Sequence, residues 1–176
     1  MTKPTSELED FLSRFDIQSV EDVENKIDEC EFFLTLASNE TQRAKFRWLI
    51  SAFLNASYSY FEMTALRAYF RFVDSNTSEP LPDAESLSII RDHVKVTQRA
   101  SNPNYVTTEG KSLLTKQLYE IRRQNTHHFP LSIMEAGPSL PEDFHLGNMR
   151  EQGVAILPIC REVMALIHEV QANLEA

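Results

Sequence analysis

The side chains of this sequence that could do chemistry are concentrated in residues 120–130, which read Glu-Ile-Arg-Arg-Gln-Asn-Thr-His-His-Phe-Pro. Two guanidinium groups, at Arg122 and Arg123, come shortly before two imidazoles, at His127 and His128. A guanidinium can bind two phosphate oxygens at once, and an imidazole can exchange a proton near neutral pH. These groups suit cleavage of an RNA phosphodiester without a metal ion, because the attacking nucleophile is the neighbouring 2′-hydroxyl of the RNA.

The spacing allows two pairings, Arg122 with His127 or Arg123 with His128. Five residues turn a straight helix by about 140° beyond one full circle, so neither pair would share a face of a regular helix. The groups would converge if the last turn unwound before Pro130, or if a second copy of the chain supplied the partner. We take Arg122 and His127 as the catalytic pair and keep the other pair as the alternative. Three neutral side chains between them are candidates for a supporting role: Gln124, Asn125 and Thr126.

A purely structural explanation of the same segment stays open. Cationic side chains near the C-terminus of a helix complement the helix dipole and can bond its last carbonyls. Asn125 and Thr126 could likewise serve as capping groups. The chemical interpretation therefore depends on how the surrounding elements position the segment.

The helix that carries this segment is predicted over residues 108–125. Pro130 disfavours helical geometry at Phe129, so the helix should end near His127 or His128. We expect four apolar residues on its inner face: Leu113, Leu114, Leu118 and Ile121.

A long central helix is predicted over residues 41–73, which contain no Gly and no Pro. It is apolar over much of its circumference, so it should contact several other helices. Its aromatic residues are expected mainly in the core. One face recurs at helical spacing: Phe46, Leu49, Ile50, Phe53, Ser57, Tyr60, Phe61, Thr64 and Ala68.

The remaining pattern predicts helices over 6–15, 19–38, 84–100 and 154–174, with loops at 74–83 and 101–105. The third of these would carry Arg91, Lys95 and Arg99 at four-residue spacing on a solvated basic face. Residues 130–153 are rich in Pro and Gly and should be irregular, with a possible small β-hairpin near 131–147. The expected fold is all-α: an antiparallel up-down bundle of about five to six helices in a single domain, residues 1–176.

Charge is unevenly distributed along the 176 residues. The formal net charge is −9, from 26 acidic and 17 basic side chains, which argues against non-specific nucleic-acid binding by the whole surface. Residues 41–130 nevertheless hold 12 basic and 8 acidic residues, whereas residues 1–40 hold 3 and 11. A local anion-binding site is therefore compatible with an acidic protein.

No metal or cofactor site is predicted. His93, His145 and His168 have no partner at metal-ligand spacing, and the sequence has no glycine-rich phosphate loop. Cys30 and Cys160 are expected to be inert buried thiols, with a disulfide as the alternative. The polar first ten residues do not resemble a signal peptide, and no apolar run approaches about 18 residues, so we expect a cytoplasmic protein without a membrane partner.

Two stretches of the sequence resemble the HEPN domain family. HEPN domains carry an Arg-x(4–6)-His motif near the end of a late helix, which the stretch from Arg122 to His127 matches. Residues 46–57, Phe-Arg-Trp-Leu-Ile-Ser-Ala-Phe-Leu-Asn-Ala-Ser, are similar to the Ser-Ala-Phe-Leu-x-Ala stretch of a central helix in some bacterial members. Together the likeness spans about residues 19–130. The sequence departs from the pattern at Arg123, where catalytic members commonly have Asn, Asp or His.

The resemblance implies a metal-independent endoribonuclease, related to toxin–antitoxin or defence systems, whose Arg122 and His127 act in the cleft of a homodimer. Its partners would be RNA and, in a toxin, an antitoxin. The alternative is a non-catalytic HEPN module that binds nucleotide or RNA, or only dimerises, beside a partner such as a nucleotidyltransferase.

Overall fold

The structure is a computed structural model that describes residues 23–70, 72–73, 76–77, 80–81, 83–99, 102–107, 110–127, 130–147 and 153–176. The described part is mostly helical, as predicted, but it also contains short antiparallel strands, so the fold is not all-α. The predicted helix over 6–15 lies outside these residues. The helices are α3 (Val23–Ala37), α4 (Arg43–Phe70), α5 (Ala84–Ile90), α6 (Leu113–His127) and α7 (Ile156–Glu175). The strands are β1 (Phe72–Val73), β2 (Pro80–Leu81), β3 (Lys95–Arg99), β4 (Asn102–Thr107), β5 (Ile133–Glu135), β6 (Phe144–Leu146) and β7 (Val154–Ala155).

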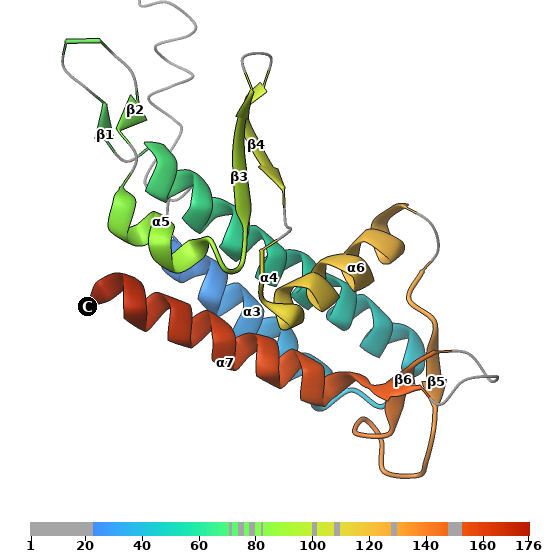
Figure 1. Cartoon of the computed structure of the whole chain (residues 1–176). Helices are drawn as coiled ribbons and strands as arrows, with labels where there is room; N and C mark the ends of the chain where they lie inside the picture. Colours follow the sequence, from blue (N-terminus) through green and yellow to red (C-terminus); the bar gives the residue numbers. More distant parts are fainter. Residues whose placement is uncertain are drawn as a thin grey trace, which may run out of the picture.

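Helix α4 is the central element, and it contacts α3, α5, α6 and α7 (Figure 1). This confirms the predicted long helix and its central position, although the helix ends at Phe70 and residues 72–73, predicted as helical, form β1. Apolar and small residues on several sides of α4 allow helices to pack around it rather than against one stripe. Its fully or nearly buried side chains include Phe46, Ile50, Phe53, Ser57, Tyr60, Phe61, Thr64 and Ala68.

The packing of α3 against α4 buries Cys30. The Ser57 hydroxyl donates to the Cys30 sulfur at 3.6 Å, so a small residue on α4 sits where the helices approach closely. Both cysteines are free, and burial raises the pKa of Cys30 to about 11 and that of Cys160 to about 12. The prediction that both thiols are buried is confirmed, and they form no disulfide.

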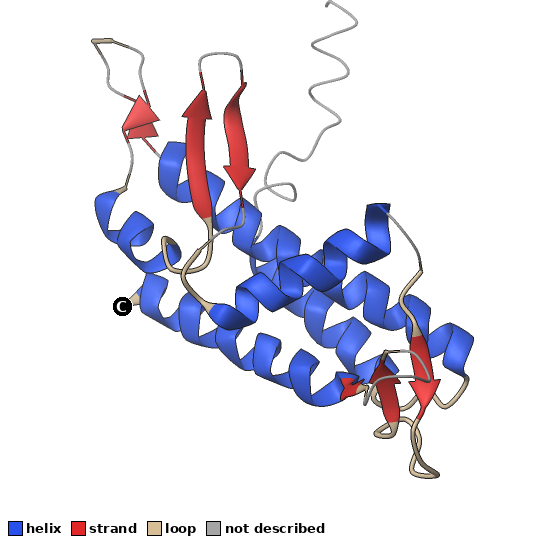
Figure 2. Ribbon diagram, turned by 45° about the vertical axis from the view of Figure 1, so that its right-hand side comes forward, coloured by secondary structure: helices blue, strands red, loops and turns tan. Residues whose placement is uncertain are grey.

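The prediction of a helix over 84–100 is wrong. Helix α5 ends at Ile90, and β3 and β4 form an antiparallel hairpin that projects away from the helices (Figures 1 and 2). The prediction of a loop over 101–105 is also wrong, because residues 102–105 belong to β4. β-branched residues lose side-chain freedom in a helix and fit a strand, and the misassigned stretch is rich in them. Lys95 and Arg99 therefore belong to a strand and do not share a helical face with Arg91.

A small sheet at the other end of the molecule confirms the hairpin predicted near 131–147. Strands β5 and β6 pair in antiparallel register, with Ile133 opposite Leu146 and Glu135 opposite Phe144. Strand β7 adds a third antiparallel strand that was not predicted. The fully buried Phe144 ring lies 4.4 Å from that of Phe46, between centroids, which fixes the sheet to the N-terminal part of α4.

Residues 74–83, between α4 and α5, were predicted as a loop. The two-residue strands β1 and β2 pair antiparallel around this segment, and β2 lies within the predicted range. Asp83 follows β2, and its carboxylate accepts hydrogen bonds from the backbone N–H groups of Glu85 and Ser86. This confirms Asp83 as the cap that starts α5. Within the described residues, no helix is both long and apolar enough to cross a membrane.

Candidate functional site: the contact between α4 and α6

Helix α6 places the Arg/His segment against α4. It begins at Leu113, later than the predicted start at residue 108, because residues 110–112 are not helical. The Ser112 hydroxyl accepts a hydrogen bond from the Thr115 N–H at 3.4 Å there, and the helix ends at His127 as predicted. Leu118 is buried, and its helical neighbours Leu114 and Ile121 pack on the core. Leu113 was wrongly assigned to this face: its side chain is 82% exposed, because it lies about 140° around the helix from Leu118.

The Arg122 side chain is half-buried and is held by residues of α4. Its Nε donates to Asn55 Oδ1 at 3.4 Å. Its guanidinium carbon lies 4.2 Å from the centroid of the buried Tyr58 ring, which is a cation–π contact. The centroid of the Tyr119 ring, one turn before Arg122 on α6, lies 5.9 Å from the centroid of the Tyr58 ring. Arg122 is thus a cation with a fixed position between two helices.

Asn125 joins the end of α6 to two other segments. Its Oδ1 accepts from Leu131 N–H at 3.3 Å and lies 3.4 Å from the donating Ser51 hydroxyl on α4. The Ser51 hydroxyl also lies 2.8 Å from the Arg47 carbonyl one turn earlier. Asn125 therefore links α6, α4 and the chain that follows Pro130.

Arg123 points to solvent and is paired within α6. Its Nε and Nη2 donate to the Glu120 carboxylate at 3.1 and 3.0 Å, and this hydrogen bonding raises its pKa. Gln124 Nε2 donates to the same carboxylate at 2.9 Å. Arg122 and Arg123, which the sequence alone does not separate, therefore lie in different environments.

The helix continues without unwinding through His127. Helical positions 122 and 127 consequently lie about 140° apart, whereas position 127 falls four residues after Arg123 and on its side of α6. Thr126 occupies the helical position four residues after Arg122. The structure does not describe the side chains of Thr126 and His127 or any part of His128. Helix α6 of one protomer thus does not bring positions 122 and 127 onto one face.

Three residues of this site were not predicted from the sequence: Ser51, Asn55 and Tyr58. They occur at three- and four-residue spacing on α4, so they share the side of α4 that α6 covers. The available signal was a short row of polar side chains among the apolar residues in the middle of the central helix. Trp48, three residues before Ser51, is 62% exposed, unlike the aromatic residues that α4 buries.

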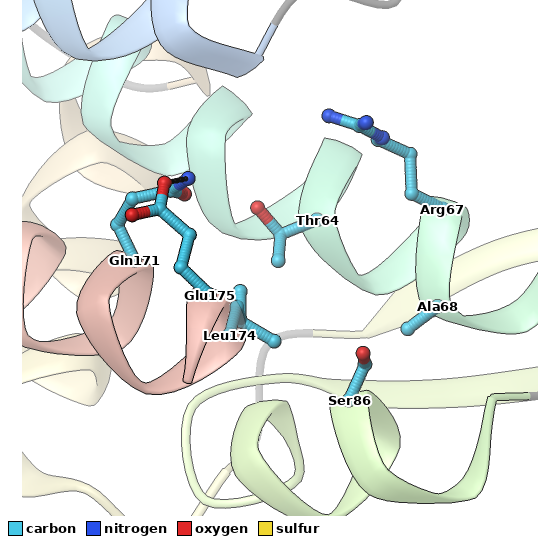
Figure 3. A pocket seen from close by; sticks show the side chains of 7 residues that line it. All are labelled: Thr64, Arg67, Ala68, Ser86, Gln171, Leu174 and Glu175. Carbon is cyan, nitrogen blue, oxygen red and sulfur yellow. Dashed lines mark hydrogen bonds between the residues drawn. The ribbon is translucent and has the colours of Figure 1, made fainter.

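A metal centre is not supported by the part of the chain described above, where no three His, Cys, Asp or Glu side chains are grouped to hold an ion. A separate cavity of about 190 Å³ lies between the C-terminal parts of α4 and α7 and helix α5 (Figure 3). Several of its polar groups are already hydrogen-bonded: Gln171 accepts from Tyr60 and donates to Glu175, and Ser86 donates to Asp83. Thr64, which lines it, is nine residues beyond Asn55, about 14 Å along α4.

Comparison of this chain with family models, with curated proteins and with solved structures found no match in any of the three. The function is therefore argued from the α4–α6 site itself.

Proposed function

We propose that this protein is a HEPN-type, metal-independent endoribonuclease that acts as a homodimer. The observation that carries the proposal is the fixed position of the Arg122 guanidinium, held by Asn55 and Tyr58 at the α4–α6 contact. A cation whose position is set before the substrate binds can stabilise charge that develops in the transition state with little reorganisation. The Arg-x4-His resemblance supplies the assignment to RNA.

In the proposed reaction the RNA 2′-oxygen attacks the adjacent phosphorus, and a base accepts the hydroxyl proton. The P–O2′ bond forms and the P–O5′ bond breaks, while an acid donates a proton to the leaving 5′-oxygen. The products are a 2′,3′-cyclic phosphate and a 5′-hydroxyl. Arg122 would offset the negative charge on the phosphoryl oxygens, and His127 would carry the proton. The step needs no metal ion and no cofactor.

The separation of helical positions 122 and 127 favours a site that two protomers complete. One copy offers Arg122 on the α4 side of α6 and position 127 on another side. A twofold arrangement can bring Arg122 of one copy near His127 of the other, and it supplies two imidazoles for the acid and the base. Dimerisation is therefore part of the proposal.

The second candidate is a HEPN module that binds RNA or nucleotide without cleaving it, beside a partner such as an antitoxin or a nucleotidyltransferase. The observation that favours it is the intact helical geometry through His127, which keeps the two positions on different faces of one chain. In this case Arg122 would bind a phosphate with no proton transfer at His127.

The test is incubation of the protein with single-stranded RNA in EDTA, comparing wild type, Arg122→Ala and His127→Ala. Arg123→Ala is the matched control, because Arg123 is adjacent in sequence and equal in charge but is paired with Glu120 in solvent. We expect both site variants to lose about 10²–10³-fold of the cleavage rate, with the control unchanged. The cleaved ends should carry 2′,3′-cyclic phosphate, and circular dichroism should show all variants folded.

The outcomes separate the candidates. Binding that depends on Arg122 without cleavage would support the non-catalytic module. Equal activity in wild type and Arg122→Ala, or an equal loss in Arg122→Ala and Arg123→Ala, would refute the site. Cleavage per protomer should also fall on dilution below the dissociation constant of the dimer, as measured by sedimentation.

A further inference from the structure

The first turns of α4 are basic on an acidic protein. Between Glu40 and Glu62 the sequence has no acidic residue, and it has three cations: Arg43, Lys45 and Arg47. Among the described residues none of the three forms an ion pair, whereas Arg123 and Arg161 do. Carboxylates are in excess in this chain, with 26 acidic and 17 basic residues. Three cations that no carboxylate pairs with therefore produce a local positive potential.

Trp48 is 62% exposed. On α4 it follows Lys45 by three residues and Arg47 by one, whereas Arg43, five residues before it, lies about 140° around the helix. The other aromatic residues of α4 whose side chains are described are buried at 7% exposure or less: Phe46, Phe53, Tyr58, Tyr60 and Phe61. An exposed indole beside cations is the combination with which proteins bind single-stranded nucleic acid, because the ring stacks on a base while the cations contact phosphates.

Trp48 is connected to Arg122 through one side of α4. Ser51 and Asn55 follow it by three and seven residues, so Trp48 and Asn55 are two helical turns apart on the same side, about 10 Å along the axis. Asn55 accepts from Arg122. The indole and the Arg122 guanidinium are therefore close enough to contact the same short oligonucleotide.

We propose that Trp48 stacks on an unpaired base of a single-stranded RNA whose phosphate is bound at Arg122, while Lys45 and Arg47 contact neighbouring phosphates. This inference rests on the proposed function, and it defines the substrate class of the same site. A base inside a duplex is already stacked on its neighbours and does not offer its face to Trp48. The site therefore selects single strands or loops, with little preference for base identity.

The experiment uses the fluorescence of Trp48, which is the only tryptophan of the chain. The His127→Ala protein is titrated with a single-stranded RNA, with the duplex of the same sequence and with an abasic oligonucleotide of the same length. We expect quenching by the single strand alone. In anisotropy with labelled RNA, Trp48→Ala should bind about tenfold more weakly, whereas Trp48→Phe should keep most of the affinity.

Phe32→Ala is the matched control, since Phe32 is an aromatic residue of α3 with 59% exposure, and it should bind RNA like the parent protein. Unchanged affinity of Trp48→Ala, or equal quenching by abasic and normal strands, would overturn the inference while leaving Arg122-dependent cleavage intact. A change in protomer association without a change in RNA affinity would assign Trp48 to a protein interface and would also overturn it. Loss of the proposed function itself would appear separately, as cleavage and binding independent of Arg122.

Discussion

The guanidinium carbon of Arg122 lies 4.2 Å from the centroid of the Tyr58 ring, so the arginine proposed to bind phosphate also joins α6 to α4. The side chain has a structural role whatever its chemical role. Substitutions at this position must therefore be examined for stability as well as for activity.

We predict that Arg122→Ala lowers the free energy of unfolding by about 1 kcal/mol, because it removes the cation–π contact with Tyr58 and the hydrogen bond to Asn55. A double-mutant cycle with Tyr58→Leu should give a coupling energy of about 0.5–1 kcal/mol in urea denaturation. Arg123→Ala should leave the unfolding curve unchanged. Strict additivity in the cycle would show that the two side chains do not interact.

Phe144→Ala should lower the free energy of unfolding by about 3–5 kcal/mol, since it empties a fully buried site against Phe46. Phe144→Leu should cost less, because most of the volume is kept. Thermal denaturation of the three proteins checks the order. A loss below 1 kcal/mol for Phe144→Ala would mean that the small sheet is not anchored through this ring.

The protein should lose stability as the pH falls below about 6.5, in part through His93. Burial against Phe61 lowers the His93 pKa, opposed by the nearby Asp92 and Glu169, and its buried Nδ1 has no hydrogen-bond partner among the described residues. The unfolded chain, with an ordinary histidine pKa of about 6.5, then binds a proton more readily than the folded one, so acidification favours unfolding. His93→Phe should lose less unfolding free energy than wild type between pH 7.5 and 5.5. An equal loss in both proteins would assign the effect to other groups.

Leu113→Glu should stabilise α6 by about 0.3–1 kcal/mol. Leu113 is 82% exposed, and the first turn of α6 has no acidic residue to interact with the helix dipole. Leu113→Lys, of similar size but opposite charge, is the control and should not raise the melting temperature. A destabilised Leu113→Glu variant would indicate that the exposed leucine has a contact in solution.

Much of the helical framework could be predicted because local signals and packing agree. The absence of Gly and Pro between Arg43 and Phe70, with apolar residues all around, identified the central helix correctly. The helix prediction failed at residues 95–99, which pair with β4 in a hairpin although their cations have helical spacing with Arg91. There, the β-branched content indicated the correct structure.

The sequence identified Arg122 and Arg123 as candidates but did not determine which one faces α4. That choice depends on the rotation of α6 about its axis, which tertiary packing sets. The spacing of four residues from Leu118 to Arg122 is compatible with Arg122 on the inner side of α6, but it does not show that α4 is the helix that Arg122 meets. Asn55 and Tyr58 could not be assigned to the site from the sequence. They lie more than 60 positions before Arg122 and contact it only in the folded protein.

The burial of Cys30 and Cys160 makes the protein suitable for site-specific labelling. Neither thiol is accessible, and both have raised pKa values, so maleimide reagents should leave the native protein unmodified. A single cysteine introduced at the exposed Trp48 position would then be its only reactive thiol. Spin labels or fluorophores attached there could measure distances across a dimer without first removing the native cysteines.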